Sequence, residues 1–249
     1  MLALLLLAAL LVTGFAYAAA NPTSARAEAA STGSIDNGKK LFLANCATCH
    51  GLNAQGRTGF APSLIGVGAA DVDFQVGTGR MPAARPDIQI QQTEVQFDGQ
   101  QIADLAAFVA SLAPGPAIPD SQYTTPAGGD IAKGGQLFLV NCAMCHNFAG
   151  SGGALTRGKY APSLMGVSGT HVFEAMLVGP QSMPVFSDTN IDPKGKQDII
   201  AYLNSVHTQA SPGGLTLGNL GTVPEGLFVW VVGLTVLVGC AVWLGSKSA

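Results

Sequence analysis

Hydrophobic residues fill both ends of the chain. Residues 2–20 are uncharged and almost wholly apolar, and the first charged residue is Arg26. This run is longer than the roughly 7–15-residue core of a secretory signal, and no basic residues precede it. Its length favours a retained membrane anchor, residues 1–20, which would give the chain two spans. A signal cleaved within residues 25–27 is the alternative.

The second apolar run, residues 226–245, lies near the C-terminus and contains no charge. As a helix it would be about 30 Å long, enough to cross a bilayer. Trp230 and Trp243 lie near its ends, where aromatic rings favour the membrane interface, and Lys247 beyond it favours a cytoplasmic C-terminus. A buried core helix would explain the hydrophobicity, but the length and the Gly-rich hinge before it, residues 209–225, favour a membrane span.

Between the two ends, apolar residues recur at helical spacing in shorter segments. Ser34 is placed to cap a helix that runs to Asn45. The glycine-rich residues 51–59 predict a loop, and we expect the chain to continue as loop to Met81. Residues 101–109 predict a packed terminal helix.

This order of segments occurs twice. The pair Asn45-Cys46 reappears 96 residues later, Ala61-Pro62-Ser63-Leu64 reappears 100 residues later, and Asp130 takes the capping position of Ser34. Self-similarity of this kind indicates two copies of one domain. We call residues 33–113 the first repeat and residues 129–208 the second repeat. The remaining segments are the linker 21–32, the proline-rich linker 114–128, the hinge 209–225 and the span 226–245.

The chemistry of the chain is concentrated in a motif that each repeat contains once. Cys-x-x-Cys-His occupies residues 46–50 and 142–146, and it is the attachment signature of c-type haem. Two thiols one helical turn apart can form thioethers with the two vinyl groups of one porphyrin, and the histidine then lies under the iron. The predicted attachment residues are Cys46, Cys49, Cys142 and Cys145, with His50 and His146 as proximal ligands.

Zinc is the alternative, because two Cys-x-x-Cys pairs could form one zinc site. The histidine that directly follows each second cysteine favours haem. We therefore expect two covalently bound haem c groups. Such groups are attached outside the cytoplasmic membrane, so the repeats must be exported.

Composition supports a membrane protein. Hydrophobic residues make up 48% of the 249 residues and charged residues only 11%, against about 25% in an average soluble protein. The net charge of −3 gives no indication of nucleic-acid binding. The fifth cysteine, Cys240, lies within the C-terminal apolar run and predicts an inert buried thiol.

Two methionines are the candidates for the sixth iron ligand. Met81 is the only methionine of the first repeat, and Met183 occupies the matching place before a proline. Thioether ligation raises a haem's reduction potential. Each methionine could instead be core filler.

The second repeat contains rivals for this role. Met165, Met176 and His171 follow its haem motif. Met176 lies in an apolar helical pattern that predicts core, and His171 is placed to cap or line the start of a helix. Met144 lies between the haem cysteines and should not reach the distal face, whereas His207 follows the last helix and is expected to be solvated.

Pro62 and Pro162 occupy equivalent positions beyond the haem motifs. A ligating histidine usually donates its second ring N–H to a carbonyl group, which fixes its tautomer. The two prolines could mark that carbonyl, or they could only shape the loop.

These motifs resemble class I cytochrome c, an all-helical fold with a proline carbonyl on the proximal histidine and a Met-Pro distal loop. In that family the first and last helices cross at a glycine and an aromatic residue. The resemblance implies that Gly38 and Phe42 face Leu105 and Phe108, and that Gly134 and Phe138 face Ile199 and Tyr202. Glycine allows the two backbones to approach closely.

The whole architecture is similar to the QcrC family, the dihaem cytochrome c subunits of actinobacterial cytochrome bcc complexes. The stretch Val223-Pro224-Glu225-Gly226 before the last span carries the more distinctive part of that likeness. It implies an electron-carrying subunit of a quinol–cytochrome c reductase, with no catalytic site of its own. The implied partners are cytochrome b, a Rieske iron–sulfur protein, a cytochrome oxidase and the lipid bilayer.

Two other functions fit the same motifs. The chain could be the dihaem subunit of another membrane dehydrogenase or oxidase. It could also be a dihaem peroxidase, which needs one iron with an open or displaceable ligand; two equivalent Met-Pro loops argue against that function.

Overall fold

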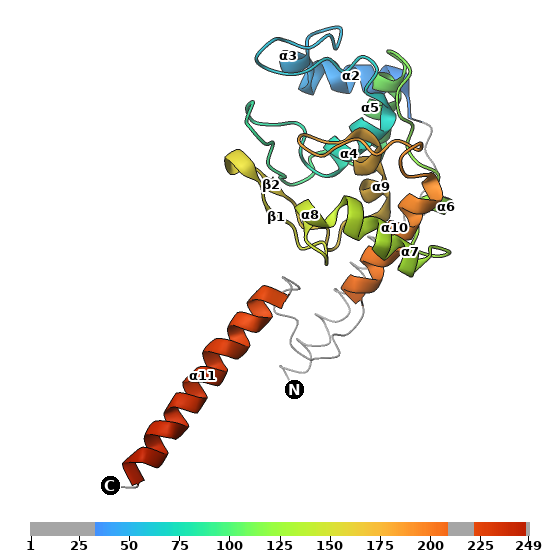
Figure 1. Cartoon of the computed structure of the whole chain (residues 1–249). Coiled ribbons are helices and arrows are strands. Elements are labelled where there is room, and N and C mark those ends of the chain that lie inside the picture. Colours follow the sequence, from blue (N-terminus) through green and yellow to red (C-terminus); the bar gives the residue numbers. More distant parts are fainter. Residues whose placement is uncertain (1–32, 209–221, 248–249) are drawn as a thin grey trace, which may run out of the picture. The chain divides into compact units, whose positions relative to one another are not determined.

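The computed structural model describes residues 33–208 and 222–247. The expected N-terminal apolar helix, residues 1–20, and the linker 21–32 lie outside the described residues, as do residues 209–221 of the hinge. The described part is mostly helical, as expected (Figure 1). The first repeat contains α2 (Ile35–Asn45), α3 (Ala47–His50), α4 (Gly68–Gly77) and α5 (Gly99–Ala110). The second repeat contains α7 (Ile131–Asn141), α8 (Ala143–His146), α9 (Gly169–Val178) and α10 (Pro193–Thr208).

The first helix of each repeat begins at the predicted cap. The Ser34 hydroxyl accepts a hydrogen bond from the Asn37 N–H at 3.3 Å, and the Asp130 carboxylate accepts from two N–H groups at the start of α7. Such caps satisfy N–H groups that have no partner within the helix. Helix α2 ends at Cys46, where the one-turn helix α3 follows at once. Each Cys-x-x-Cys-His motif therefore lies on a helical turn directly after its repeat's first helix.

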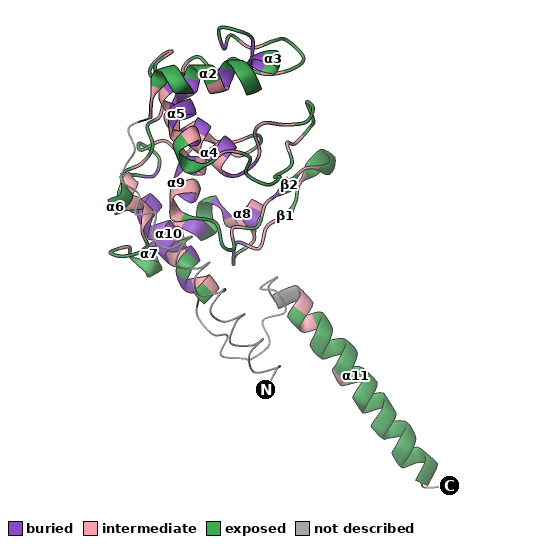
Figure 2. Ribbon diagram, turned by 180° about the vertical axis from the view of Figure 1, so that it is seen from behind, coloured by how far each residue is buried: buried purple, intermediate pink, exposed green. Residues whose placement is uncertain are grey.

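The first and last helices of each repeat cross at a glycine, as the cytochrome c resemblance implies. A Cβ atom on Gly38 would overlap the carbonyl oxygen of Asp104 on α5. Beside it, the rings of Phe42 and Phe108 lie 5.2 Å apart. Figure 2 shows buried residues on both helices where they meet.

The second repeat has the same crossing between α7 and α10. A Cβ atom on Gly134 would overlap the carbonyl oxygen of Asp198, and the rings of Phe138 and Tyr202 lie 5.4 Å apart. Phe138 is completely buried. Both repeats therefore depend on direct backbone contact, which only a residue without a side chain allows.

A buried aspartate also ties the ends of each repeat together. Asp104 Oδ1 accepts a hydrogen bond from Ser34 N at 2.7 Å, and Asp198 Oδ1 accepts from Asp130 N at 2.8 Å. Burial by itself would raise the pKa of Asp198, but hydrogen bonds from Lys194 and from Asp130 outweigh it and hold that pKa below its usual value. The carboxylate is thus charged and accepts a hydrogen bond from Asp130, the residue that caps the repeat's opening helix.

Helix α4 corrects the expectation of a continuous loop up to Met81. Its buried residues are every second one, Ala70, Val72, Phe74 and Val76, a spacing typical of strands rather than helices. The helix packs against α5 on one side and against α9 of the second repeat on another. A helix covered on several sides has no single apolar stripe, so its sequence lacks the usual helical signal.

The fold is all-α as predicted, with one short addition that the prediction did not include. Within the longer loop of the second repeat, β1 (Gly153–Ala154) pairs antiparallel with β2 (Tyr160–Ala161), and the 3₁₀ turn η1 (Thr156–Gly158) joins them. In the first repeat the same region forms only a single bridge between Arg57 and Ala61. The additional residues of the second repeat allow the chain to fold back on itself.

The linker 114–128 does more than separate the repeats, and it contains a short helix, α6 (Ser121–Thr124). The Pro116 carbonyl accepts a hydrogen bond from Ala70 N in the first repeat at 3.1 Å. In the second repeat, the Gln197 amide donates to the carbonyls of Gln122 and Ala127 at 2.7 and 2.9 Å. The linker is therefore hydrogen-bonded to both repeats.

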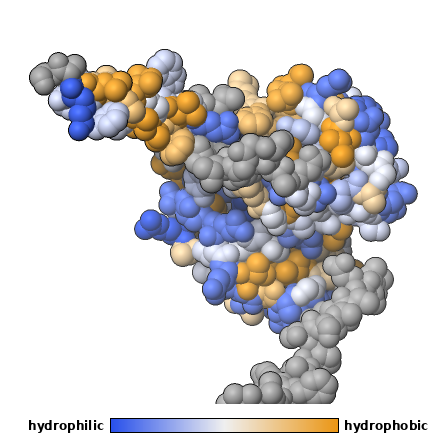
Figure 3. Space-filling view, turned by 90° about the horizontal axis from the view of Figure 1, so that it is seen from below, coloured by the Kyte–Doolittle hydropathy of each residue, from blue (hydrophilic) through white to orange (hydrophobic). Residues whose placement is uncertain are grey.

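The C-terminal helix α11 (Thr222–Lys247) begins before the predicted start at residue 226 and includes the last four residues assigned to the hinge. Residues Pro224–Lys247 have a mean hydropathy of 2.5, and an 18-residue window of them has no buried residue. Figure 3 shows hydrophobic residues along this helix behind a hydrophilic tip. Length and composition make α11 a candidate membrane span.

We predict that Gly134→Ala destabilises the second repeat by about 1–3 kcal/mol, because the new methyl group meets a backbone carbonyl that cannot move aside. Gly99→Ala is the matched control, since no atom lies within 4 Å of the methyl group it adds. Thermal unfolding followed by far-ultraviolet circular dichroism measures both. Equal unfolding midpoints for the two variants would contradict the proposed role of the crossing.

Candidate haem sites

The two motif histidines lie in the same environment. His50 and His146 are buried, with 7% and 8% of their surface exposed. His50 Nδ1 lies 2.8 Å from the carbonyl oxygen of Pro62, and His146 Nδ1 lies 3.0 Å from that of Pro162. A carbonyl oxygen can only accept, so Nδ1 donates in both rings and each Nε2 keeps its lone pair for a metal.

Burial also keeps the second histidine neutral. Desolvation lowers the pKa of His146 below its usual value, although the hydrogen bond to Pro162 opposes this shift. A neutral imidazole is the form that binds a metal ion.

The motif cysteines lie on the same turns but differ in exposure. Burial, and then the neighbouring Cys49, raise the pKa of Cys46 to about 11, and burial with Cys145 does the same for Cys142. Among residues 33–208 and 222–247, one group of three side chains brings its possible metal ligands within 4.8 Å of one another, and it contains no cysteine. The geometry therefore does not support the zinc alternative at these motifs.

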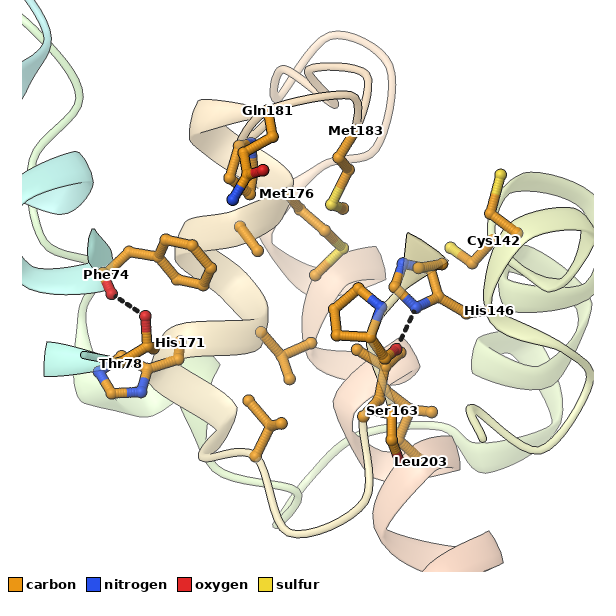
Figure 4. Close-up of a pocket in the computed structure, with 18 of the residues that line it drawn as sticks. Phe74, Thr78, Cys142, His146, Ser163, His171, Met176, Gln181, Met183 and Leu203 are labelled. Atoms are coloured by element: carbon orange, nitrogen blue, oxygen red, sulfur yellow. Dashed lines mark hydrogen bonds between the residues drawn. The ribbon is translucent and has the colours of Figure 1, made fainter. Parts of the chain in front are cut away.

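A cavity of about 560 Å³ lies beside the second motif (Figure 4). Cys142, Cys145 and His146 line one part of it, and Met183 lines another. The volume falls in the range of about 300–1,000 Å³ that is usual for cofactor pockets. The donor set fits haem c: two thiols for the vinyl groups, one imidazole nitrogen and one thioether sulfur.

Four methionines line this cavity: Met144, Met165, Met176 and Met183. Figure 4 shows Met176 on α9 and Met183 on the loop that follows, both directed into the space that His146 faces. Met176 belongs to the core, as expected, with 2% of its surface exposed, but it also lines the cavity. The sequence pattern did not indicate this position in the cavity. Met81 packs against the core of the first repeat.

Of the other candidate ligands, Met144, Met165 and His171 also line this cavity, whereas His207 is not among its lining residues. The Met144 side chain is 93% exposed. His171 lies in the first turn of α9, where its N–H is capped by Ser168, and its ring faces the first repeat. The expectation that His207 is solvated is wrong: it is half-buried, and its Nε2 lies 3.1 Å from the carbonyl oxygen of Ala149. A loop of the second repeat folds over the end of α10 and covers this ring.

The first repeat supplies part of the wall of the second repeat's cavity. Phe74 in α4 and Thr78 directly after it line the cavity (Figure 4). Arg80 lines it as well. The Arg80 guanidinium donates to Thr78 Oγ1 at 2.6 Å and lies 4.9 Å from the centre of the Phe74 ring. No sequence signal pointed to this wall, because its residues belong to the other repeat. Arg80 directly precedes Met81, so the two candidate sites share a boundary.

Hydrogen bonds hold this boundary together. The Gln89 side chain bonds to both backbone groups of Tyr160, each at 2.8 Å. Gln181 does the same to Ile90, at 3.0 and 3.1 Å. The loop after Met81 is thus paired with two segments that border the second cavity.

Comparisons with known proteins agree with this architecture. Residues 35–113 match the family model "Cytochrome c", and residues 129–203 match the model "Cytochrome C oxidase, cbb3-type, subunit III". The chain is 44% identical to the cytochrome bc1 complex cytochrome c subunit of Mycobacterium tuberculosis over 98% of this chain and 90% of that protein. The same subunit of Corynebacterium efficiens is 44% identical, over 86% of this chain and 77% of the relative.

A more distant relative is the cbb3-type cytochrome c oxidase subunit FixP of Bradyrhizobium diazoefficiens. It is 26% identical over 68% of this chain and 60% of its own length. The similarity along nearly the whole chain is therefore to cytochrome bc1 complex cytochrome c subunits.

We predict that Gln181→Ala speeds amide exchange at Ile90, and that Gln89→Ala speeds it at Tyr160. Each variant removes the acceptor of that N–H, a loss of about 0.5–1.5 kcal/mol or up to about tenfold in exchange. Gln122→Ala is the control, because its exposed amide hydrogen-bonds to Asp120 within the linker. Hydrogen–deuterium exchange with mass spectrometry measures all three, and unchanged exchange in both variants would show that these bonds do not hold the repeats together.

Proposed function

We propose that this chain, which belongs to the family of cytochrome bc1 complex cytochrome c subunits of actinobacteria, is an electron carrier. In this proposal electrons come from a Rieske iron–sulfur protein and leave to a terminal oxidase. The chain is the cytochrome c subunit of a quinol–cytochrome c reductase in a respiratory chain. Two cytochrome c domains imply two covalently bound haem c groups. The observation that carries this function is the 44% identity along 98% of the chain.

The proposal extends to the ligands. Cys46 and Cys49 hold one haem and Cys142 and Cys145 the other, with His50 and His146 as proximal ligands. Met81 and Met183 complete the two iron sites. The hydrogen bonds from each histidine Nδ1 to a proline carbonyl support this, because they leave Nε2 free. Bound haem c supplies reversible one-electron Fe(III)/Fe(II) chemistry.

The protein has three tasks at each site: to position the histidine, to present a thioether sulfur and to exclude water. The carbonyl groups of Pro62 and Pro162 position the histidines. In the second repeat the mostly apolar walls exclude water, and two of the lining residues, Met176 and Leu203, are buried. A dry, apolar surrounding and a thioether ligand both act on the reduction potential.

Transfer between the two sites is favoured by their shared boundary. Arg80 lines the second cavity while its neighbour Met81 belongs to the first site. The bonds of Gln89 and Gln181 keep the facing loops in register. We infer that electrons cross between the repeats at this wall, within one chain.

The membrane helix places the carrier beside its partners. The subunit is membrane-bound, and α11 is its candidate span. We propose that both repeats lie on the extracytoplasmic side, that Lys247 lies on the cytoplasmic side, and that cytochrome b, the Rieske protein and an oxidase are neighbours. A tethered carrier meets its partners at a high effective concentration.

A second candidate function has one specific observation in its favour. Residues 129–203 match the model of cbb3-type oxidase subunit III, and FixP is a distant relative. A carrier subunit built into such an oxidase would have the same haem chemistry but would lack a cytochrome b and Rieske partner.

We predict that Met183→Leu lowers the reduction potential of one of the two haems and removes its methionine–iron absorption, because leucine has no sulfur to bind iron. Met176→Leu is the matched control: it fills the same cavity but should leave the potential unchanged. Spectroelectrochemical titration of the full chain distinguishes the two. The reverse result would make Met176 the ligand.

We predict that the full chain, purified from membranes in mild detergent, retains cytochrome b, the Rieske protein and an oxidase, and that quinol reduces its haems. Haem staining and mass spectrometry identify the partners. Recovery with an oxidase alone would favour the second candidate function, and a colourless chain would overturn both.

A further inference from the structure

The contact between α4 and α9 contains three ionisable groups, of which His171 also lines the second repeat's cavity while Asp73 and Glu174 are not among its lining residues. The two helices pack together, one from each repeat (Figures 1 and 2). Asp73 lies on α4. His171 and Glu174 lie on α9, three residues apart and so on one face of the helix. Their ligand atoms all lie within 4.8 Å of one another.

Glu174 is the unexpected member of this cluster. Its exposed fraction is 0%, and neither carboxylate oxygen has a hydrogen-bond partner among the described residues. A buried carboxylate without a partner is costly, and native proteins avoid it. Burial first, then the adjacent charge of Asp73, and then the hydrogen bond that a protonated Glu174 can share with Asp73, raise the pKa of Glu174 to about 10. Two acids thus face each other without a bonded cation.

The histidine completes a set of donors. His171 Nε2 lies 3.8 Å from Asp73 Oδ2, and both side chains are about three-quarters buried. Burial mainly, with help from the positive charge of Arg80, lowers the pKa of His171, although Asp73 opposes the shift. A lowered pKa favours the neutral imidazole, which is the form that binds a metal ion.

We propose that Asp73, His171 and Glu174 bind a divalent transition-metal ion of the zinc type at the α4–α9 contact. One imidazole nitrogen and two carboxylate oxygens are donors that zinc accepts, and they leave a fourth tetrahedral position for water. Binding of the ion would displace the proton of Glu174, and the two carboxylates would then balance a doubly charged ion. Calcium and magnesium fit less well, because both prefer oxygen donors only.

Such a site would connect the repeats. Asp73 belongs to the first repeat and the other two ligands to the second, so the ion binds only when α4 and α9 are docked. Binding therefore stabilises the docked arrangement, and with it the wall that Phe74 and Arg80 give to the second cavity. The competing possibility for the same atoms is a proton shared by Asp73 and Glu174, which needs no metal.

The test uses the untagged full chain with both haems in detergent, freed of metal by a chelator. We expect calorimetric titration with Zn²⁺ to give one site per chain. Glu174→Gln and Asp73→Asn should each weaken binding at least tenfold while haem content and helicity stay unchanged. His207→Gln is the control, since this half-buried histidine lies outside the cluster.

Three outcomes decide the proposal. One zinc site that is lost in Glu174→Gln and Asp73→Asn and kept in His207→Gln supports it. If Glu174→Gln does not fold, Asp73→Asn, at a partly exposed member of the cluster, decides alone. No zinc uptake by the wild-type chain, or equal affinity in all variants, overturns the site and favours the shared proton. Either of these results leaves the proposed electron-transfer function untouched.

Discussion

Direct contact between two helix backbones is the constraint on which each repeat depends. Gly38 and Gly134 leave no space for a side chain against the carbonyls of Asp104 and Asp198. The side chains of the same aspartates accept hydrogen bonds from the N–H of the residue that caps the crossing helix, Ser34 or Asp130. Because the Cys-x-x-Cys-His turn follows that helix without a spacer, the crossing also fixes where each motif histidine lies.

The two repeats share this frame but differ in what surrounds it. In the first repeat, α4 is covered on several sides, and the loop after Met81 reaches across to the second repeat. In the second repeat, the longer loop folds into a hairpin, and the cavity takes part of its wall from its neighbour. Duplication therefore produced two similar iron sites in unequal environments. Unequal environments are a physical basis for unequal reduction potentials.

The boundary between the repeats contains several polar interactions. Glutamine side chains bond to backbone groups across it, the linker bonds to both sides, and the cluster of Asp73, His171 and Glu174 is enclosed within it. A tethered carrier does not need to diffuse, so a rigid pair of domains is an advantage. The polar groups provide that rigidity where glycine and aromatic packing cannot.

The sequence by itself determined the parts whose physics is local. The spacing of cysteines and histidine defines haem attachment, Ser34 and Asp130 mark helix starts, and residues 226–245 are long and apolar enough to span a bilayer. Helix α4 could not be predicted, because a helix buried on several sides has no hydrophobic stripe. The cover over His207, the cavity position of Met176 and the contribution of Arg80 to its neighbour's site were also decided only by tertiary structure. Each of these depends on which segments meet across a distance in the chain, and no local pattern of residues encodes that meeting.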